Sequence, residues 1–269
     1  MASIGLHTAA TGLSSLQLKL DTIANNLANS NTNGFKAQRV NFEDLLYQDK
    51  VQPGLENANG DQRPVGIQVG MGVRVSNVDR DFRQGSAIET GQELDLMIDG
   101  AGFFAVDLFE DEGNGIGYAR VGNFFKNADG DMVLGNSQGP RLEPLINIPD
   151  DARSLQIQAD GRIMALLDGA TELEEIGQIQ LVTFVNPKGL RSIGENVFVE
   201  TGASGPPVEG EPGLEGVGTI KQGFLEGSNV DAVRELVELI NVQRAFEMNS
   251  QSIQAADEAM QVVANLRRF

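Results

Sequence analysis

The chain has 269 residues, of which 41% are hydrophobic, so it can bury a core and is not expected to be disordered throughout. Its 38 acidic side chains outnumber 20 basic ones, and this negative charge repels phosphate backbones, which argues against nucleic acid as a partner. Cysteine is absent and histidine occurs once, which excludes a thiol nucleophile, a disulfide scaffold and a Cys-ligated zinc site.

The first segment has apolar residues at alternating steps of three and four, which predicts an amphipathic helix with a heptad pattern. These positions are Leu6, Ala9, Leu13, Leu16, Leu20, Ile23 and Leu27. A polar run from Asn29 to Asn33, followed by Gly34, predicts the end of this helix. No basic stretch precedes a continuous apolar one at the start of the chain, so we expect that, if the protein leaves the cytoplasm, it does so without a cleaved signal peptide.

The last segment has a similar pattern. Ser228 and Asp231 have the spacing of a capping box, which predicts that a helix begins near them. The apolar stripe of this helix comprises Leu239, Val242, Phe246, Ile253, Met260 and Val263, with Asn249 and Ala256 at two further stripe positions. A second stripe of Val233, Val237 and Ile240 widens the apolar face near the start. We therefore predict a long amphipathic helix at each end of the chain.

Between these helices the apolar period changes from that of a helix to that of strands. Strands are predicted within residues 73–75, 94–108, 155–157, 163–167 and 179–185, with turns at Asp129-Gly130, Asp160-Gly161 and Asn186-Pro187. The predicted fold is multi-domain α and β, with N- and C-terminal helices paired as a coiled coil and a β-rich middle domain. Its boundaries are 1–34 and 228–269 for the coiled coil, 35–71 and 202–227 for connecting segments, and 72–201 for the middle domain.

The terminal helices are predicted to be an assembly interface. Burying one large apolar side chain stabilises a fold by roughly 1.5–3 kcal/mol, whereas ordering one residue costs roughly 1–2 kcal/mol of backbone entropy. One isolated helix pair is therefore marginal, and helices of further copies would bury the remaining flanks. An intramolecular helical hairpin that caps the β-rich domain explains the periodicity equally well.

No catalytic or metal-binding constellation is evident. His7 lies beside the apolar stripe and is interpreted as a partly exposed helix residue. Gly100-Ala101-Gly102 lacks the next glycine of a dinucleotide loop. Residues 127–131 lack the glutamate that closes a calcium loop and are interpreted as a hairpin turn. We therefore predict no catalytic residue, no cofactor and no metal.

Two motifs near the chain ends resemble the signatures of bacterial flagellar rod and hook proteins. The first is Ile23-Ala24-Asn25-Asn26-Leu27-Ala28-Asn29 followed by Asn31-Thr32-Asn33-Gly34-Phe35-Lys36. The second comprises Ser228-Asn229-Val230, Glu235-Leu236-Val237 and Gln243-Arg244-Ala245-Phe246-Glu247. The signature positions are Asn25, Asn26, Asn29, Asn33, Gly34, Phe35, Gln243, Arg244 and Ala245. Residues 42–48, 66–73, 102–104 and 192–196 are similar to distal rod members of this family.

The resemblance implies a structural subunit of the flagellar distal rod that self-assembles into a rigid tubular drive shaft and transmits torque from motor to hook. It implies an inner wall of paired helices, an outer β-rich domain, and a stretch at 48–66 that stiffens the rod. The implied partners are further copies of the chain in a helical homopolymer, proximal rod proteins, the hook protein, the P- and L-ring proteins and the flagellar export apparatus. The implied location is the basal body, from periplasm to outer membrane.

Other functions remain open at this point. A hook or proximal rod subunit would carry similar terminal signatures. A peptidoglycan-cleaving enzyme could use two of the abundant carboxylates, although nothing in the sequence singles out a pair. A secreted adhesion or binding module is a third interpretation.

Overall fold

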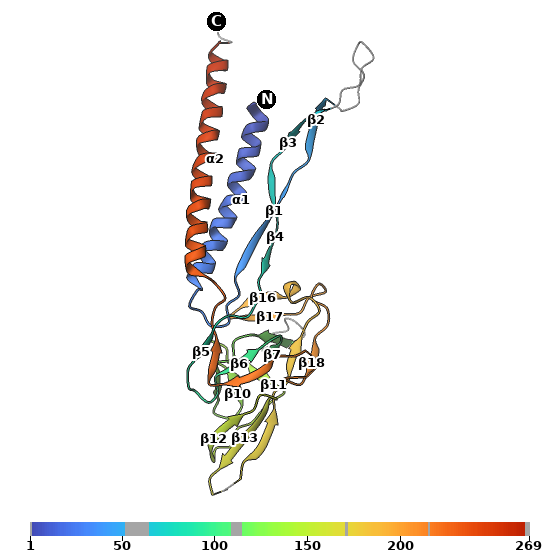
Figure 1. The fold of residues 1–269 in the computed structure, drawn as a ribbon, viewed down its shortest axis with the longest axis vertical. Helices are drawn as coiled ribbons and strands as arrows, with labels where there is room; N and C mark the ends of the chain where they lie inside the picture. Colours follow the sequence, from blue (N-terminus) through green and yellow to red (C-terminus); the bar gives the residue numbers. More distant parts are fainter. Residues whose placement is uncertain (1, 52–64, 109–114, 170–171, 215, 267–269) are drawn as a thin grey trace. The chain divides into compact units, whose positions relative to one another are not determined.

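The computed structural model describes residues 2–51, 65–108, 115–169, 172–214 and 216–266. An N-terminal helix, a β-rich middle and a C-terminal helix follow one another, as the sequence predicts (Figure 1). The chain divides into two compact units. Unit 1 comprises Met1–Ala28, Gln38–Arg80 and Asp231–Phe269, and unit 2 comprises Asn29–Ala37 and Asp81–Val230. No helix among the described residues is long and apolar enough to cross a membrane.

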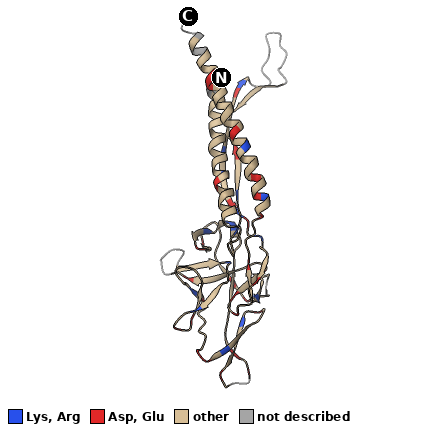
Figure 2. Ribbon diagram, turned by 90° about the vertical axis from the view of Figure 1, so that its left-hand side faces the viewer, with Lys and Arg blue, Asp and Glu red and all other residues tan. Residues whose placement is uncertain are grey.

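Unit 1 contains helices α1 (Ala2–Ala28) and α2 (Ala232–Leu266), which run antiparallel side by side (Figure 1). The side chain of Asp231 caps α2, because its Oδ1 accepts hydrogen bonds from the N–H groups of Val233 at 3.1 Å and Arg234 at 3.2 Å. Ser228 is not this cap, since its hydroxyl accepts from Val230 N, before the helix begins. Charged residues are few in α1, whereas α2 carries acidic and basic residues along much of its length (Figure 2).

A two-stranded ribbon completes unit 1. Strand β1 (Gln38–Asp44) pairs antiparallel with β4 (Val73–Arg80), and β2 (Tyr47–Val51) pairs with β3 (Ile67–Gly70). Strands β1, β2 and β3 lie in segment 35–71, which was expected to be a connection. They were not predicted because a two-stranded ribbon buries little core, so its sequence shows little alternation of apolar and polar residues. Residues 52–64, most of the predicted rod stretch 48–66, lie outside the described residues.

Unit 2 is built on a nine-stranded sheet with the order β16-β17-β8-β7-β11-β10-β9, in which β15 joins β7 to β18. Its strands are β7 (Phe103–Asp107), β8 (Ile116–Ala119), β9 (Phe124–Lys126), β10 (Met132–Leu134), β11 (Arg141–Glu143), β15 (Leu181–Thr183), β16 (Arg191–Gly194), β17 (Val197–Val199) and β18 (Val208–Gly210). A short 3₁₀ helix, η2 (Pro187–Gly189), precedes β16.

Three smaller sheets complete unit 2. Strands β12 (Ala152–Ile157), β13 (Arg162–Leu167) and β14 (Glu174–Gln178) form one of them. In the other two, β5 (Ala87–Glu89) pairs with β20 (Phe224–Glu226), and β6 (Leu96–Asp99) pairs with β19 (Thr219–Gln222). Segment 202–227, expected to be a connection, thus supplies β18, β19 and β20 to unit 2. Its glycines and prolines obscured these short strands in the sequence.

Both faces of β7 are buried, which explains its continuous apolar run. Phe104 and Val106 belong to the larger core cluster, whereas Phe103 and Ala105 face a second cluster on the opposite side of the sheet. Successive side chains of a strand point to opposite faces, so a strand covered on both sides loses the polar alternation of a surface strand.

Two local predictions in unit 2 have different outcomes. The turn at Asp129-Gly130 joins β9 and β10, and Asn127 Oδ1 stabilises it by accepting from the N–H groups of Asp129 and Asp131 at 2.9 and 2.8 Å. The strand predicted at 179–185 is shorter than expected, and Val185 is 85% exposed beyond its end.

The buried phenol of Tyr118 predicts how alkali affects unit 2. Burial, with the carboxylates of Glu200, Glu209 and Glu143, raises the pKa of Tyr118 from 10.0 to about 12. The unfolded chain therefore releases this proton first, and stability present below pH 10 should fall by about 2 kcal/mol as pH rises to 12. Urea denaturation at pH 9.5 and 12 should show this loss in the parent and a smaller loss in Tyr118→Phe. Equal losses in both chains would contradict the assignment.

Candidate assembly surfaces

The predicted stripe of α1 lies on the partly covered side of that helix. Ile23 is buried, and the other stripe positions are half-buried in the single chain: Leu6, Leu13, Leu16, Leu20 and Leu27. A neighbouring face of α1 carries the buried polar side chains of Ser15, Thr22 and Asn26, and Asn26 there bonds the backbone of Gln38 in β1. These were not predicted as interface positions, because periodicity counts only apolar residues.

The predicted stripe of α2 is less completely covered. Val242 is buried, whereas Leu239, Phe246 and Ile253 are half-buried. Met260 is 38% exposed, and the side chain of Val263 lies outside the described residues. Cover therefore decreases towards the C-terminal end of α2.

Two contacts give the register of α1 against α2. Lys19 forms an ion pair with Glu238, and Gly12 faces Asn249, whose Nδ2 would lie 3.1 Å from a Cβ at position 12. A glycine on α1 thus leaves room for the one polar residue of the α2 stripe. Helix α1 begins ten residues before Gly12. In the antiparallel α2, the position opposite that start is therefore about ten residues after Asn249, at residue 259. The last turns of α2, including Met260, consequently extend past α1.

A second face of α2 is apolar and exposed. Val233 is 72% exposed, and Leu236, Val237 and Ile240 are each about half exposed. Their spacing of three, four and seven residues places all four on one side of the helix. The sequence indicated three of them as a second stripe, and the structure adds Leu236. An exposed apolar row of this kind is typical of a surface that contacts another protein.

The ribbon also exposes large apolar side chains, and these were not predicted. Leu46 is 87% exposed, and Tyr47 and Ile67 are each more than half exposed. The ribbon reaches α1 at Gly72, where a Cβ would lie 2.3 Å from Thr11 Oγ1. An isolated pair of strands is marginally stable in water, so the far part of this ribbon gains stability when another surface covers it.

The N-terminal signature residues shape the turn after α1. Asn26 is buried and binds both polar groups of Gln38, because its Oδ1 accepts from the backbone N–H at 2.9 Å and its Nδ2 donates to the carbonyl at 2.8 Å. Gly34 has φ +70°, and a Cβ there would lie 2.8 Å from Val121 Cβ. Asn33 accepts a hydrogen bond at its carbonyl from Asn196, and Phe35 is buried. These roles are structural and lie within the separate units.

The remaining signature residues have less defined surroundings. Asn25 and Asn29 lie at the end of α1, where Asn29 accepts a hydrogen bond from the Thr32 hydroxyl at 3.1 Å. On α2, Gln243 and Arg244 are exposed and Ala245 is half-buried. The two exposed polar residues are therefore available for contacts outside the single chain.

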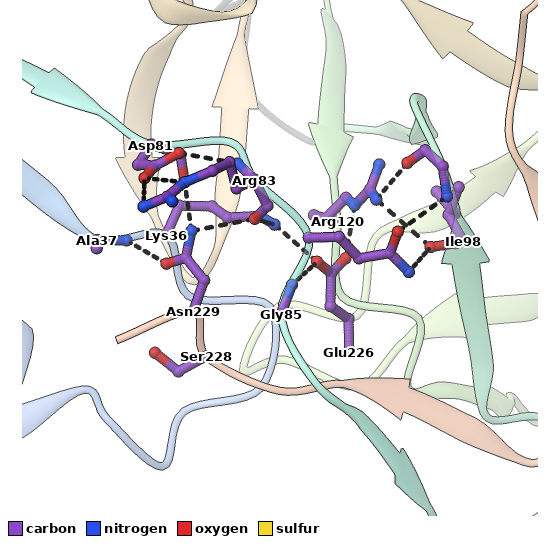
Figure 3. A network of polar contacts seen from close by, with 12 residues as sticks. Lys36, Ala37, Asp81, Arg83, Gly85, Ile98, Arg120, Glu226, Ser228 and Asn229 are labelled. Atoms are coloured by element: carbon purple, nitrogen blue, oxygen red, sulfur yellow. Dashed lines mark hydrogen bonds and ion pairs between the residues drawn. The ribbon is translucent and has the colours of Figure 1, made fainter. Parts of the chain in front are cut away.

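Unit 2 contains a buried charge cluster of Lys36, Arg120 and Glu226 (Figure 3). Lys36 Nζ lies 2.7 Å from Glu226 Oε1, and Arg120 Nε lies 2.6 Å from Oε2. The backbone N–H of Gly85 also donates to Oε1 at 2.8 Å. Burial lowers the pKa of Lys36, although the neighbouring Glu226 carboxylate opposes this shift. Sequence reasoning missed the cluster, because its members are far apart along the chain.

Backbone carbonyls accept further hydrogen bonds from the two cations of the cluster. Arg120 donates to the carbonyls of Gly102 and Gly100, each at 2.5 Å, and Lys36 donates to the Arg83 carbonyl at 2.8 Å. Among the described residues, no buried side-chain nitrogen or oxygen lacks a hydrogen-bond partner.

Asn229 joins three stretches of unit 2 beside the charge cluster. Its Oδ1 accepts from Ala37 N at 2.7 Å, and its Nδ2 donates to the carbonyls of Asp81 and Arg83 at 2.7 and 3.0 Å (Figure 3). The motif residue Asn229 thus has a defined structural role, although the sequence indicated only its place in a signature.

His7 is exposed, and no group of three or more histidine, cysteine, aspartate or glutamate side chains in the described ranges is placed to hold a metal ion. The features that stand out are exposed apolar faces in unit 1 and a buried ionic cluster in unit 2.

Comparison with known families matches three parts of the chain. Residues 6–36 match the description "Flagella basal body rod protein", and residues 97–165 match "Flagellar hook protein FlgE/F/G D1 domain". Residues 221–266 match "Flagellar basal body rod FlgEFG protein C-terminal". The outer two matches cover both motifs on which the resemblance rests.

Curated relatives align over nearly the whole chain. The flagellar basal-body rod protein FlgG of Agrobacterium fabrum is 44% identical over 260 residues, 96% of this chain and 97% of the relative. Proteins of the same name from Caulobacter vibrioides and from Buchnera aphidicola of Acyrthosiphon pisum are 43% and 42% identical, and each alignment covers 97% of this chain and 98% of the relative.

Proposed function

The chain belongs to the flagellar basal-body rod protein FlgG family, and from this premise we propose that the exposed apolar faces of unit 1 polymerise it into a tubular shaft. It is a structural subunit of the flagellar distal rod, located in the flagellar basal body. A hook or proximal rod identity is less favoured, since the relatives that are 42–44% identical over 96–97% of the chain are named FlgG. The single observation that carries the polymerisation proposal is the exposed row of Val233, Leu236, Val237 and Ile240 on α2.

The predicted stripes supply the contact within one subunit. We propose that α1 and α2 pair as an antiparallel coiled coil, in which Leu13, Leu16 and Leu20 pack near Val242 and Phe246. The Lys19–Glu238 ion pair and the Gly12–Asn249 approach support this register. The heptad spacing of both stripes supports the coiled-coil geometry.

The exposed row of α2 supplies contacts between subunits. Because these four side chains are already partly covered, burying what remains exposed would contribute roughly 3–7 kcal/mol in total. Association itself costs about 4–15 kcal/mol, so one such contact gives at most a weak dimer. In a helical array each copy contacts several neighbours, so several such contacts add up and the assembly becomes stable. A head-to-tail contact whose rotation does not close into a ring produces such an open helical polymer.

The ribbon is proposed to reach a neighbouring subunit in the same array. Leu46, Tyr47 and Ile67 would become buried there, which stabilises a pair of strands that is marginal alone. This contact and the adjoining stretch 48–66 would stiffen the shaft. The end-on partners are proximal rod proteins on one side and the hook protein on the other. The P- and L-ring proteins would surround the shaft between periplasm and outer membrane, and the flagellar export apparatus would deliver the subunit.

Gene deletion and complementation test the proposed function. Cells without this chain should build basal bodies that lack the distal rod and the hook, and the parent gene should restore both. Val233→Ser/Val237→Ser/Ile240→Ser should not restore them, whereas the matched exposed substitution Gln251→Ser/Gln254→Ser/Gln261→Ser should. Electron microscopy of isolated basal bodies is the measurement. Complete hooks in the deletion strain would refute the function, and full rescue by the apolar-row variant would refute the proposed contact.

We propose that the subunit has no catalytic activity. The relatives are named as rod proteins, and the conspicuous carboxylate of unit 2, Glu226, is engaged by two cations. Purified chain incubated with peptidoglycan should release no soluble fragments, as followed by chromatography. Fragment release that scales with protein concentration and is lost in Glu226→Gln would support the rival enzyme.

A further inference from the structure

The charge cluster joins three distant parts of the chain. Lys36 and Glu226 are 190 residues apart in sequence, and Arg120 and Glu226 are 106 apart. The carbonyl of Glu226 also accepts from Gly34 N at 2.7 Å, so one residue near the end of unit 2 binds both its first and its middle segments. During synthesis, which proceeds from the N-terminus, Lys36 and Arg120 appear long before Glu226.

The two cations cannot be buried at low cost without Glu226. The Lys36 and Glu226 side chains are fully buried, and that of Arg120 is 5% exposed. Removing one partner from such a cluster leaves an uncompensated buried charge, which is strongly destabilising. A sheet that closes around Lys36 and Arg120 before Glu226 arrives would carry two such charges.

Strand pairing also requires that the last segment joins before unit 2 can close. In the described part of unit 2, β5 pairs with β20 and β6 pairs with β19. Leu96 and Ile98 of β6 belong to the larger core cluster together with Ile220 of β19. The first strands of unit 2 therefore obtain their ladder partners from the last segment, 219–226, and non-local pairing of this kind forms late.

We propose that Lys36, Arg120 and Glu226 form a charge latch: the two cations keep unit 2 open until segment 219–226 brings Glu226 to them. The two cations disfavour closure of the β7–β8 region on its own, and Glu226 reverses this penalty as β19 and β20 complete their pairs. Unit 2 consequently folds as one step that requires nearly the whole chain, instead of closing early into a partial sheet with unpaired edges. The latch concerns folding and is independent of the polymerisation proposal.

Pulsed hydrogen exchange during refolding of the full chain tests the latch. In the parent, amides of Val106 and Tyr118 should gain protection in the same kinetic phase as those of Ile220 and Leu225. The triple variant Lys36→Met/Arg120→Met/Glu226→Leu replaces the cluster by apolar groups. In it, the amides of Val106 and Tyr118 should gain protection about tenfold faster than those of segment 219–226, since local contacts then form first. Lys126→Gln, which removes an exposed ion pair of the same unit, should behave like the parent.

Equilibrium exchange supplies the second measurement. Glu226→Gln should lower protection of Tyr118 by about a hundredfold to a thousandfold, and adding Lys36→Met should restore part of it by removing one uncompensated cation. Separate phases in the parent would overturn the latch, as would a single phase in a folded triple variant. If the triple variant does not fold, the test is whether Lys36→Met partly restores the protection of Tyr118 that Glu226→Gln lowers. No such recovery would overturn the proposal.

Discussion

Phe246→Asp should abolish growth of the rod while leaving unit 2 folded. Phe246 is half-buried on the α2 stripe in the single chain, and we propose that it becomes fully buried in the assembled wall. A carboxylate at that place would pay a desolvation penalty of several kcal/mol in every subunit. Sedimentation and electron microscopy of purified chain should show monomers where the parent forms rods.

The matched control is Gln254→Asp, which adds the same charge at an exposed position of the same helix. This variant should polymerise like the parent. The fold of unit 2 can be followed separately, because the chain has two tyrosines: Tyr118 lies in unit 2 and Tyr47 in the ribbon. In a Tyr47→Phe background, an unchanged Tyr118 signal would show that unit 2 is intact. Normal rods from Phe246→Asp would refute the helix-based mechanism.

Phe104→Ala should destabilise unit 2 by about 3–5 kcal/mol, because it removes a buried ring and leaves a cavity. Phe104 has no exposed surface, and its ring meets that of Phe124 edge to face at a centroid distance of 5.2 Å. Urea denaturation followed by Tyr118 fluorescence measures the change in the free energy of unfolding.

Phe125→Ala is the control for this substitution. Phe125 belongs to the same sheet but is 58% exposed, so its loss should change the free energy of unfolding by less than about 1 kcal/mol. Similar effects of the two substitutions would contradict the assignment of β7 to the centre of the core.

The helices were predictable because their signal is local and repeated. Steps of three and four from Leu6 to Leu27 mark α1, and those from Leu239 to Met260 mark α2. The end of α1 was predictable from the asparagine run. The spacing of Ser228 and Asp231 predicted where α2 begins but not which of the two caps it, because both are good capping residues and only geometry distinguishes them.

The middle of the chain was harder to predict. β7 was found through its apolar run, but β18, β19 and β20 are three or four residues long within a segment rich in glycine. The pairing of β19 with β6 joins residues more than 100 positions apart, and periodicity contains no information on such partners. The charge cluster was missed for the same reason.

The candidate assembly surfaces were also only partly predictable from the sequence. The stripes were predicted, whereas exposure at Leu236 and along the ribbon depends on what the rest of unit 1 leaves uncovered. Membership of a polymer followed from the resemblance at the chain ends, since periodicity alone fits an intramolecular hairpin equally well.

Helical reconstruction of the isolated basal body by electron cryomicroscopy tests the central claim most directly. The account predicts that this chain fills the rod segment next to the hook, with α1 and α2 lining the inner wall and with Val233, Val237 and Ile240 buried against a neighbouring copy. A rod segment without this chain, or one in which that row of α2 faces solvent, would contradict the account.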